Sequence, residues 1–224
     1  MKPGSGRLDT LTVANLVLLA FLISATFIVM LLPPQVQKIL YQVCISGILI
    51  SAFFCIDKVY RRYMKWMLAA SVVIQWMYIL IDSFLLDGIS KSVIICLYVI
   101  IAVSLVKQAA SSKSVNRIVI LESVNGYLMI AMFYAVIIAL IMLVDPLAYH
   151  FQTPLKNDAE ILTNFNEYLY YGFNAFTTVT YGDVMPVSPV AKSVSMAIGF
   201  TGQMYVAIII AMLVGKYAGE SSSK

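Results

Sequence analysis

Hydrophobic residues along this chain gather in long runs that short polar segments separate. Six runs are candidates for membrane helices, at approximately residues 11–32, 37–56, 66–86, 92–106, 123–144 and 190–217. A helix of about 20 predominantly apolar residues crosses the hydrocarbon core of a bilayer. The pattern therefore predicts an all-α membrane protein with six transmembrane helices.

A seventh apolar stretch, residues 165–178, lies between the last two runs and is too short to span a bilayer. Asn164 precedes it and Glu167 follows three residues later, a pair that resembles a capping box and predicts a helix start. Five aromatic residues decorate the expected helix, namely Tyr168, Tyr170, Tyr171, Phe173 and Phe176. The stretch is predicted to enter the membrane without crossing it.

Composition supports a membrane location. The chain is 61% hydrophobic and 12% charged, whereas soluble domains are about 45–50% apolar and about 25% charged. The net charge of +4 is small and dispersed, so no nucleic-acid partner is expected. The three cysteines lie within apolar runs without metal-ligand spacing, so neither a metal site of Cys and His residues nor another cofactor is expected.

Charge also predicts the orientation. With six spans, one side of the membrane receives all but four of the 15 lysines and arginines; these four are Lys38, Lys91, Lys156 and Lys192. Basic loops stay in the cytoplasm. We therefore expect a multi-pass protein of the plasma or inner membrane with both termini cytoplasmic.

The most distinctive string is Thr-Thr-Val-Thr-Tyr-Gly-Asp at residues 177–183. Non-helical backbone at membrane depth is tolerated only when it is buried in protein or lines a cavity, and potassium channels use it to bind dehydrated ions through carbonyl oxygens. The string resembles the selectivity filter of the tetrameric potassium-channel superfamily, whose usual form is Thr-Val-Gly-Tyr-Gly-Asp. Thr180 stands at the first glycine.

The resemblance implies a homotetramer, in which each chain associates with three identical subunits and with membrane lipid. It implies K⁺ binding by Thr178, Val179, Thr180 and Tyr181, with Gly182 turning a carbonyl toward the axis. Asp183 is expected to bond to the pore helix behind the filter. Tyr170, Tyr171 and Glu167 are expected to support the filter, the two tyrosines as part of an aromatic collar. Without the filter string, the aromatic residues would indicate an interfacial belt.

Thr180 leaves three outcomes open. A β-branched residue disfavours the left-handed conformation that the family's glycine adopts. The surrounding collar forces the strained conformation, or the carbonyl of Val179 or Thr180 flips away, or the Thr180 hydroxyl replaces a carbonyl ligand.

Four segments are expected. Residues 1–107 form a four-helix peripheral domain without the ladder of basic residues that a voltage sensor needs. Residues 108–122 form a cytoplasmic amphipathic linker, 123–217 the pore domain, and 218–224 a short cytoplasmic tail. Gly199 and Gly202 in the last helix are candidates for a gating hinge, or for close helix packing.

The expected function is passive, potassium-selective conduction with little voltage dependence. A non-selective monovalent cation channel of the same fold is the alternative, because of Thr180. A transporter is a remote alternative, since the two halves of the chain show no repeat. An enzyme is not expected, because the spans lack a constellation of ionisable residues.

Overall fold

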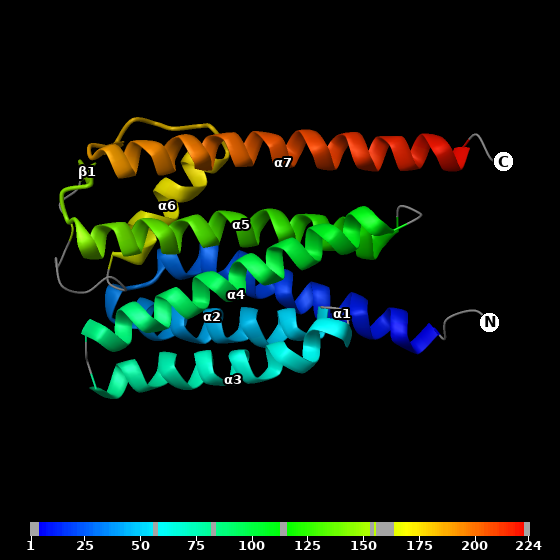
Figure 1. Cartoon of the computed structure of the whole chain (residues 1–224), viewed down its shortest axis with the longest axis horizontal. Coiled ribbons are helices and arrows are strands. Elements are labelled where there is room, and N and C mark those ends of the chain that lie inside the picture. Colours follow the sequence, from blue (N-terminus) through cyan, green and yellow to red (C-terminus); the bar gives the residue numbers. More distant parts are fainter. Residues whose placement is uncertain are drawn as a thin grey trace.

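The computed structural model describes residues 5–55, 58–81, 84–112, 116–152, 155 and 164–221. It is mostly helical (Figure 1). The α-helices are α1 (Ser5–Ile23), α2 (Pro34–Cys55), α3 (Lys58–Ile81), α4 (Phe84–Ser111), α5 (Arg117–Val144), α6 (Phe165–Phe176) and α7 (Pro189–Ser221). A π-helical turn (Ser24–Ile28) and a 3₁₀ turn (Val29–Leu31) extend α1. Two short strands, β1 (Tyr149–Phe151) and β2 (Val184–Pro186), pair antiparallel.

Helix boundaries follow local signals in the sequence. The side chain of Asn116 accepts a hydrogen bond from the Val119 N–H (3.0 Å) and caps the start of α5. Pro34 and Pro189 occupy the first positions of α2 and α7, where a missing N–H costs nothing. Asp145 is the C-cap residue of α5, and Pro146 follows it directly and cannot continue the helix.

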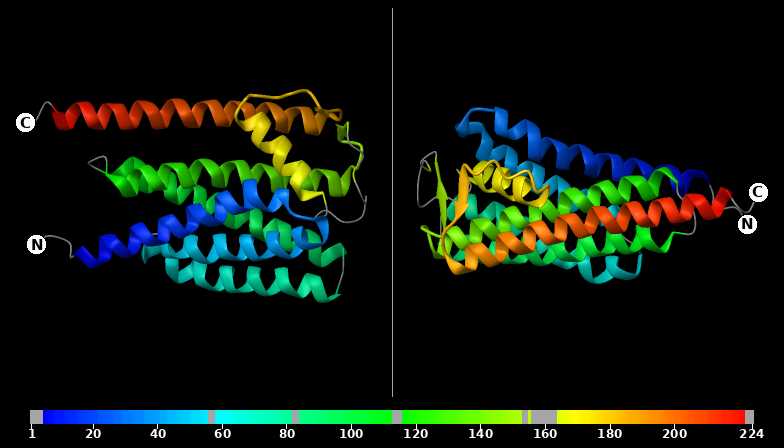
Figure 2. Two further views of the ribbon diagram at one scale, coloured as in Figure 1. Left: turned by 180° about the vertical axis from the view of Figure 1, so that it is seen from behind. Right: turned by 90° about the horizontal axis from the view of Figure 1, so that it is seen from above.

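The long helices run side by side with α5 in the middle. Helix α5 contacts α1, α4, α6 and α7, and α7 lies along it on the side away from α3 (Figure 1). The beginning of α1 and the end of α7 lie at the same end of the molecule (Figure 2), as an even number of crossings requires.

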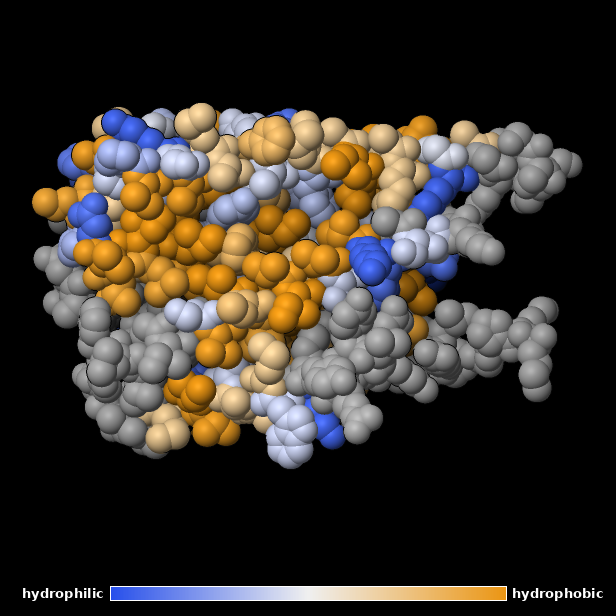
Figure 3. Space-filling view, viewed as in Figure 1, coloured by the Kyte–Doolittle hydropathy of each residue, from blue (hydrophilic) through white to orange (hydrophobic). Residues whose placement is uncertain are grey.

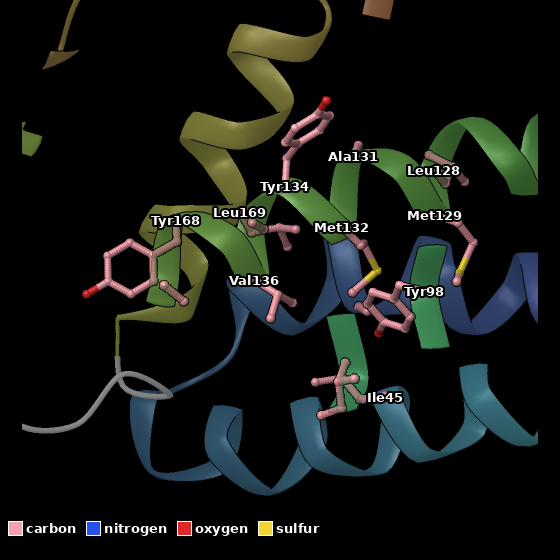
Figure 4. Close-up of a cluster of buried hydrophobic side chains, with 14 of the residues drawn as sticks. Ile45, Tyr98, Leu128, Met129, Ala131, Met132, Tyr134, Val136, Tyr168 and Leu169 are labelled. Carbon is pink, nitrogen blue, oxygen red and sulfur yellow. The ribbon is translucent and has the colours of Figure 1, made fainter. Parts of the chain in front are cut away.

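The core surrounds α5 and takes buried residues from α1, α2, α4 and α6 as well. Tyr98 of α4 is fully buried beside Met132 of α5, and Leu169 of α6 packs against the same part of α5 (Figure 4). A polar contact also joins the first helix to α5: the Asn125 amide donates to the backbone oxygen of Asn15 at 3.0 Å, and both residues are fully buried. The peripheral helices are therefore fixed directly to the helix that supports α6.

Five of the six predicted spans are confirmed as candidates by length and composition within the described residues: Leu11–Leu31, Gln35–Cys55, Ser92–Ala109, Arg117–Val144 and Pro189–Ala218. The limits predicted for the sixth span, residues 66–86, were wrong. Helix α3 begins at Lys58 with several basic residues and ends at Ile81, and Phe84 already belongs to α4. The six-span count stays a prediction.

The predicted linker helix is also different. The expectation of a separate amphipathic helix after residue 108 was wrong for the described part: Ala109 lies in the last turns of α4, and Glu122 lies in the second turn of α5. Both helices are longer than the apolar pattern alone suggested. Lys113 and Val115, on which that pattern partly rested, lie outside the described residues.

Candidate functional site

Helix α6 has only 12 residues and lies at an angle between α5 and α7 (Figures 1 and 2). It begins at Asn164, as predicted, and the Glu167 N–H donates to the backbone oxygen of Asn164 (3.0 Å). The side chain of Asn164 makes no capping hydrogen bond, so the predicted capping box is not completed. The helix ends at Phe176, directly before the filter-like string, which we call the filter segment (residues 177–183).

The aromatic side chains of α6 pack against neighbouring elements on several sides. Phe176 packs against Tyr127 and Tyr134 of α5, with ring centroids 4.8 and 6.2 Å apart. The other ring pairs of α6 are Phe165 with Tyr41, Tyr168 with Phe151, Tyr171 with Tyr149, and Phe173 with Phe27. Such pairs favour edge and tilted geometries, which orient the rings as well as burying them. These contacts hold α6 along its length against α2, α5, β1 and the π-helical turn that follows α1.

Helix α7 lies so close to the end of α6 that the backbone of Gly202 contacts the backbone of Phe176. A Cβ placed on Gly202 would lie 1.9 Å from the backbone oxygen of Phe176, a distance that no side chain tolerates. On the opposite side, a Cβ on Gly172 would lie 3.4 Å from the backbone nitrogen of Ala135 in α5. The contact at Gly202 shows that this glycine is needed for close packing.

The filter segment turns back onto the end of α6 through its N–H groups. The Thr178 N–H donates to the Ala175 oxygen (3.2 Å), and the N–H groups of Val179 and Thr180 both donate to the Asn174 oxygen (3.0 and 3.4 Å). The C-terminal carbonyls of a helix otherwise lack intrahelical partners. These bonds fix the start of the segment to α6.

Backbone handedness alternates along the segment. Thr178, Thr180 and Gly182 have φ angles of 61°, 33° and 83°, while Val179 and Tyr181 between them have no positive φ. Alternation of right- and left-handed residues places successive N–H groups on one side of the chain. In a trans peptide the C=O of one residue points opposite to the N–H of the next. The N–H groups of 178–180 donate to α6, so the carbonyl oxygens of residues 177–179 are directed away from α6.

The backbone at Thr180 corresponds to the first of the three predicted outcomes: the threonine adopts the left-handed region despite its β-branch. The positive φ of Gly182 was expected, because glycine adopts it without steric cost. The positive φ of Thr178 was not anticipated.

Asp183 fixes the far end of the segment. The Tyr170 hydroxyl donates to Asp183 Oδ2 (2.7 Å), so the predicted hydrogen bond to α6 is present. The Gln152 N–H donates to the backbone oxygen of Asp183 (3.1 Å) next to the β1–β2 pair. The hydrogen bond from the Tyr170 hydroxyl to the Asp183 carboxylate raises the pKa of Tyr170, because loss of the phenolic proton would remove the donor and place a second negative charge beside the carboxylate.

Comparison with known proteins gives one match. Residues 137–218 match a protein family described as an ion channel. We call this matched part of the chain the channel domain. The match includes the last eight residues of α5, all of α6, the filter segment and most of α7. The matched family is an ion channel and not an enzyme. No curated protein and no solved structure matches the chain.

The proposed support residues of the channel domain occupy different places. Tyr170 contacts the filter segment directly. Tyr171 instead shares a hydrogen bond with Ser195 of α7 (2.7 Å). Glu167 lies in the first turn of α6, about 15 Å along the helix axis from the segment at about 1.5 Å per residue. The structure therefore brings only Tyr170 and Asp183 of this set together.

Three contacts of the channel domain escaped the sequence interpretation. The Gln203 amide Nε2 donates to the Thr178 hydroxyl (3.0 Å), the oxygen of Asn174 accepts two N–H groups of the segment, and the Gln152 N–H bonds to Asp183. Gln203 lies in the middle of the largely apolar helix α7, so an amide side chain at membrane depth was the sequence feature that could have indicated its contact with Thr178.

Helix α7 is continuous through Gly199 and Gly202. A Cβ on Gly199 would meet the Ala175 oxygen at 3.6 Å, which is an ordinary contact, unlike the clash at Gly202. Of the two explanations considered for these glycines, close packing has direct support at Gly202, and a hinge stays a prediction.

Proposed function

We propose that this protein is a potassium-selective channel that conducts K⁺ passively across the membrane. The observation that carries the proposal is the filter segment, whose positive φ angles alternate at Thr178, Thr180 and Gly182 while its N–H groups bond to α6. These bonds direct the carbonyl oxygens of Thr178 and Val179 away from α6, and we expect those of Thr180 and Tyr181 to continue the same row. A row of carbonyl oxygens is the ligand set that replaces the hydration shell of K⁺.

The end of α6 adds to this environment. Helix C-termini carry a partial negative charge that favours a nearby cation, and the filter segment begins directly at the end of α6. We expect K⁺ ions to bind at Thr178, Val179, Thr180 and Tyr181, with Gly182 at the outer end. No other cofactor is needed for passive conduction.

A single chain supplies oxygen atoms on only one side of an ion, so we propose a homotetramer. The exposed face of the segment supports this: Tyr181 is 73% exposed in the isolated chain. Large apolar side chains of α7 are exposed too, with Met196 at 77% and Phe200 at 66%. Three identical subunits would cover part of these surfaces.

The membrane location rests on the apolar surface. A broad apolar band lies between hydrophilic residues toward the two ends of the molecule (Figure 3). With the basic residues on the side of the termini, we propose a multi-pass protein of the plasma or inner membrane with cytoplasmic termini.

The test is a reversal potential. The full chain is purified, reconstituted into a planar bilayer and measured with KCl on one side and NaCl on the other. A value near the potassium equilibrium potential supports the proposal. A value near zero, with chloride excluded, would instead identify the non-selective cation channel, in which Thr180 disrupts the selective geometry. Absence of any cation current from verified proteoliposomes would overturn both.

We further propose little voltage dependence. In the sequence of α4 the charged residues are Asp87, Lys91 and Lys107, all near its ends. Each charge that crosses the field contributes about 2.3 kcal/mol per 100 mV, and no ladder of such charges exists in this helix. A shallow conductance–voltage curve is expected, and a slope that requires several charges per subunit would contradict it.

A further inference from the structure

An apolar groove follows the second half of α4. One cavity of about 550 Å³ lies between α4, α5 and α7, and its lining includes Val99, Val103, Lys107, Ile130, Phe133 and Tyr205. A second cavity of about 460 Å³ shares Val99, Val103 and Lys107 and continues on another face of α4. We call the first cavity, with its continuation around α4, the α4–α5 groove.

The groove lies at membrane depth. Its three helices are all candidate spans, and the α4 residues that line the first cavity belong to the span Ser92–Ala109. Apart from Lys107 and Tyr205, the lining of the first cavity is entirely aliphatic or aromatic, and the Tyr205 hydroxyl already donates to the Ser123 oxygen (2.6 Å). Water needs polar partners and leaves apolar cavities empty. An apolar chain therefore suits this groove better than water.

One end of the groove is basic. Lys107 lines the groove and is exposed. Two residues farther along α4, the Ala109 oxygen accepts a hydrogen bond from Lys216 Nζ of α7 (2.9 Å), so a second cation is close to the same end. Arg117, also exposed, begins α5 on this side, and the carboxylate on the adjoining part of α5, Glu122, is buried.

We propose that the α4–α5 groove binds a phospholipid with an anionic headgroup. One acyl chain lies along Val99, Val103 and Phe133, and the headgroup phosphate pairs with Lys107, with Lys216 nearby. Two complementary features, one at each end of the groove, favour such a lipid. The apolar length suits a hydrocarbon chain, and basic residues at the membrane surface attract anionic lipid.

Such a lipid would touch the channel domain itself. Tyr205, in the groove wall, belongs to α7, and its ring packs against Tyr127, which in turn packs against Phe176 at the end of α6. Lys216 links the far part of α7 to α4. Occupation of the groove is therefore expected to alter the opening of the pore as well as the stability of the protein.

The test compares two lipids on the full chain. The protein is reconstituted in bilayer nanodiscs containing equal amounts of phosphatidylglycerol and phosphatidylcholine, and the lipid retained per chain is measured by native mass spectrometry. Preferential retention of phosphatidylglycerol is expected. Lys107→Gln should lower that retention about fivefold, the effect of about one surface charge, whereas Lys192→Gln, also exposed but near the opposite end of α7, should not.

A second variant tests the apolar part. Val103 is 59% exposed, so Val103→Trp should fill the groove without disturbing the core and should lower retention of both lipids. Equal retention of the two lipids by the unmodified protein, or equal effects of Lys107→Gln and Lys192→Gln, would overturn the proposal. So would cross-linking between copies at Val103→Cys in a Cys96→Ser background, because a neighbouring chain would then cover the groove. Retention is measured without ionic current, so its outcome is independent of whether the channel conducts K⁺.

Discussion

The side chain of Gln203 donates a hydrogen bond to the hydroxyl of Thr178, with 3.0 Å between Nε2 and Oγ1. Gln203 belongs to α7, whereas Thr178 is the first of the proposed ion-binding residues. The Thr178 hydroxyl donates in turn to the Thr177 oxygen (2.7 Å). One polar side chain therefore joins the long helix of the channel domain to the end of the filter segment nearest α6.

Replacement of Gln203 by Leu should weaken cation selectivity. The change removes the donor that orients the Thr178 hydroxyl, and a neutral hydrogen bond contributes about 1 kcal/mol. The permeability ratio of K⁺ to Na⁺, measured from bi-ionic reversal potentials, is expected to fall about fivefold. Met204→Leu, at the next position of α7, is the control and should leave the ratio unchanged. Equal ratios for Gln203→Leu and the unmodified protein would show that the Thr178 hydroxyl does not influence selectivity.

Thr180→Gly should stabilise the protein. The φ of 33° at Thr180 is left-handed, which costs an L-residue about 1–2 kcal/mol. Glycine removes that cost but loses about 0.5–1 kcal/mol through the greater freedom of the unfolded chain. A net gain of about 1 kcal/mol per chain is expected, measured as a higher midpoint in SDS-induced unfolding.

The matched variant is Thr180→Ala, which removes the β-branch but keeps the Cβ atom. Because the penalty for positive φ arises from the Cβ atom, alanine should recover little of the gain. If Thr180→Ala stabilised the protein as much as Thr180→Gly, the β-branch rather than the backbone handedness would be the source of strain. Selectivity for K⁺ in Thr180→Gly is expected to equal or exceed that of the unmodified protein.

Tyr170→Phe should destabilise the conducting form of the filter segment. The lost hydrogen bond joins Tyr170 to the carboxylate of Asp183 at 2.7 Å, and bonds to charged groups contribute about 1.5–3 kcal/mol. The open probability of single channels should therefore fall at least tenfold. Tyr171→Phe is the control on the same helix, because it removes a bond of the same length to Ser195 instead; it should change stability but not open probability. Equal loss in both variants would show that α6 packing, not the Asp183 contact, controls opening.

Local patterns predicted much of the channel domain. The start of α6 and its aromatic residues follow from its own sequence, whereas the contact of Asp183 with α6 followed from the resemblance of residues 177–183 to a potassium-channel filter. Hydrophobic run lengths likewise located five of the spans. Segments with strong periodicity and clear capping residues are the most reliable parts of a sequence interpretation.

Other features depend on contacts between distant residues. Gln203 and Thr178 are 25 positions apart, and Asn15 and Asn125 are 110 positions apart, so neither pair leaves a periodic pattern. The boundary between α3 and α4 was placed several residues too late, because the first residues of α4, Phe84 to Leu86, continue the apolar run of α3 in the sequence. The β1–β2 pair consists of three residues per strand, too short for alternation to be visible.

Gly202→Ala and Gly199→Ala separate packing from hinge motion in α7. A Cβ on Gly202 would meet the Phe176 oxygen at 1.9 Å, so alanine must push α7 away from α6; overpacking of this kind costs about 1–3 kcal/mol. At Gly199 the nearest atom is 3.6 Å away, and alanine should be accepted, with a helix-propensity gain of up to about 1 kcal/mol.

Both variants are measured by SDS-induced unfolding and by open probability. If packing is the role of Gly202, its alanine variant loses stability while Gly199→Ala gains it and still opens. A Gly199→Ala protein that is stable but stays closed would instead identify residue 199 as a hinge. Alanine fits at this position in the folded structure, so a loss of opening alone would mean that α7 has to bend there.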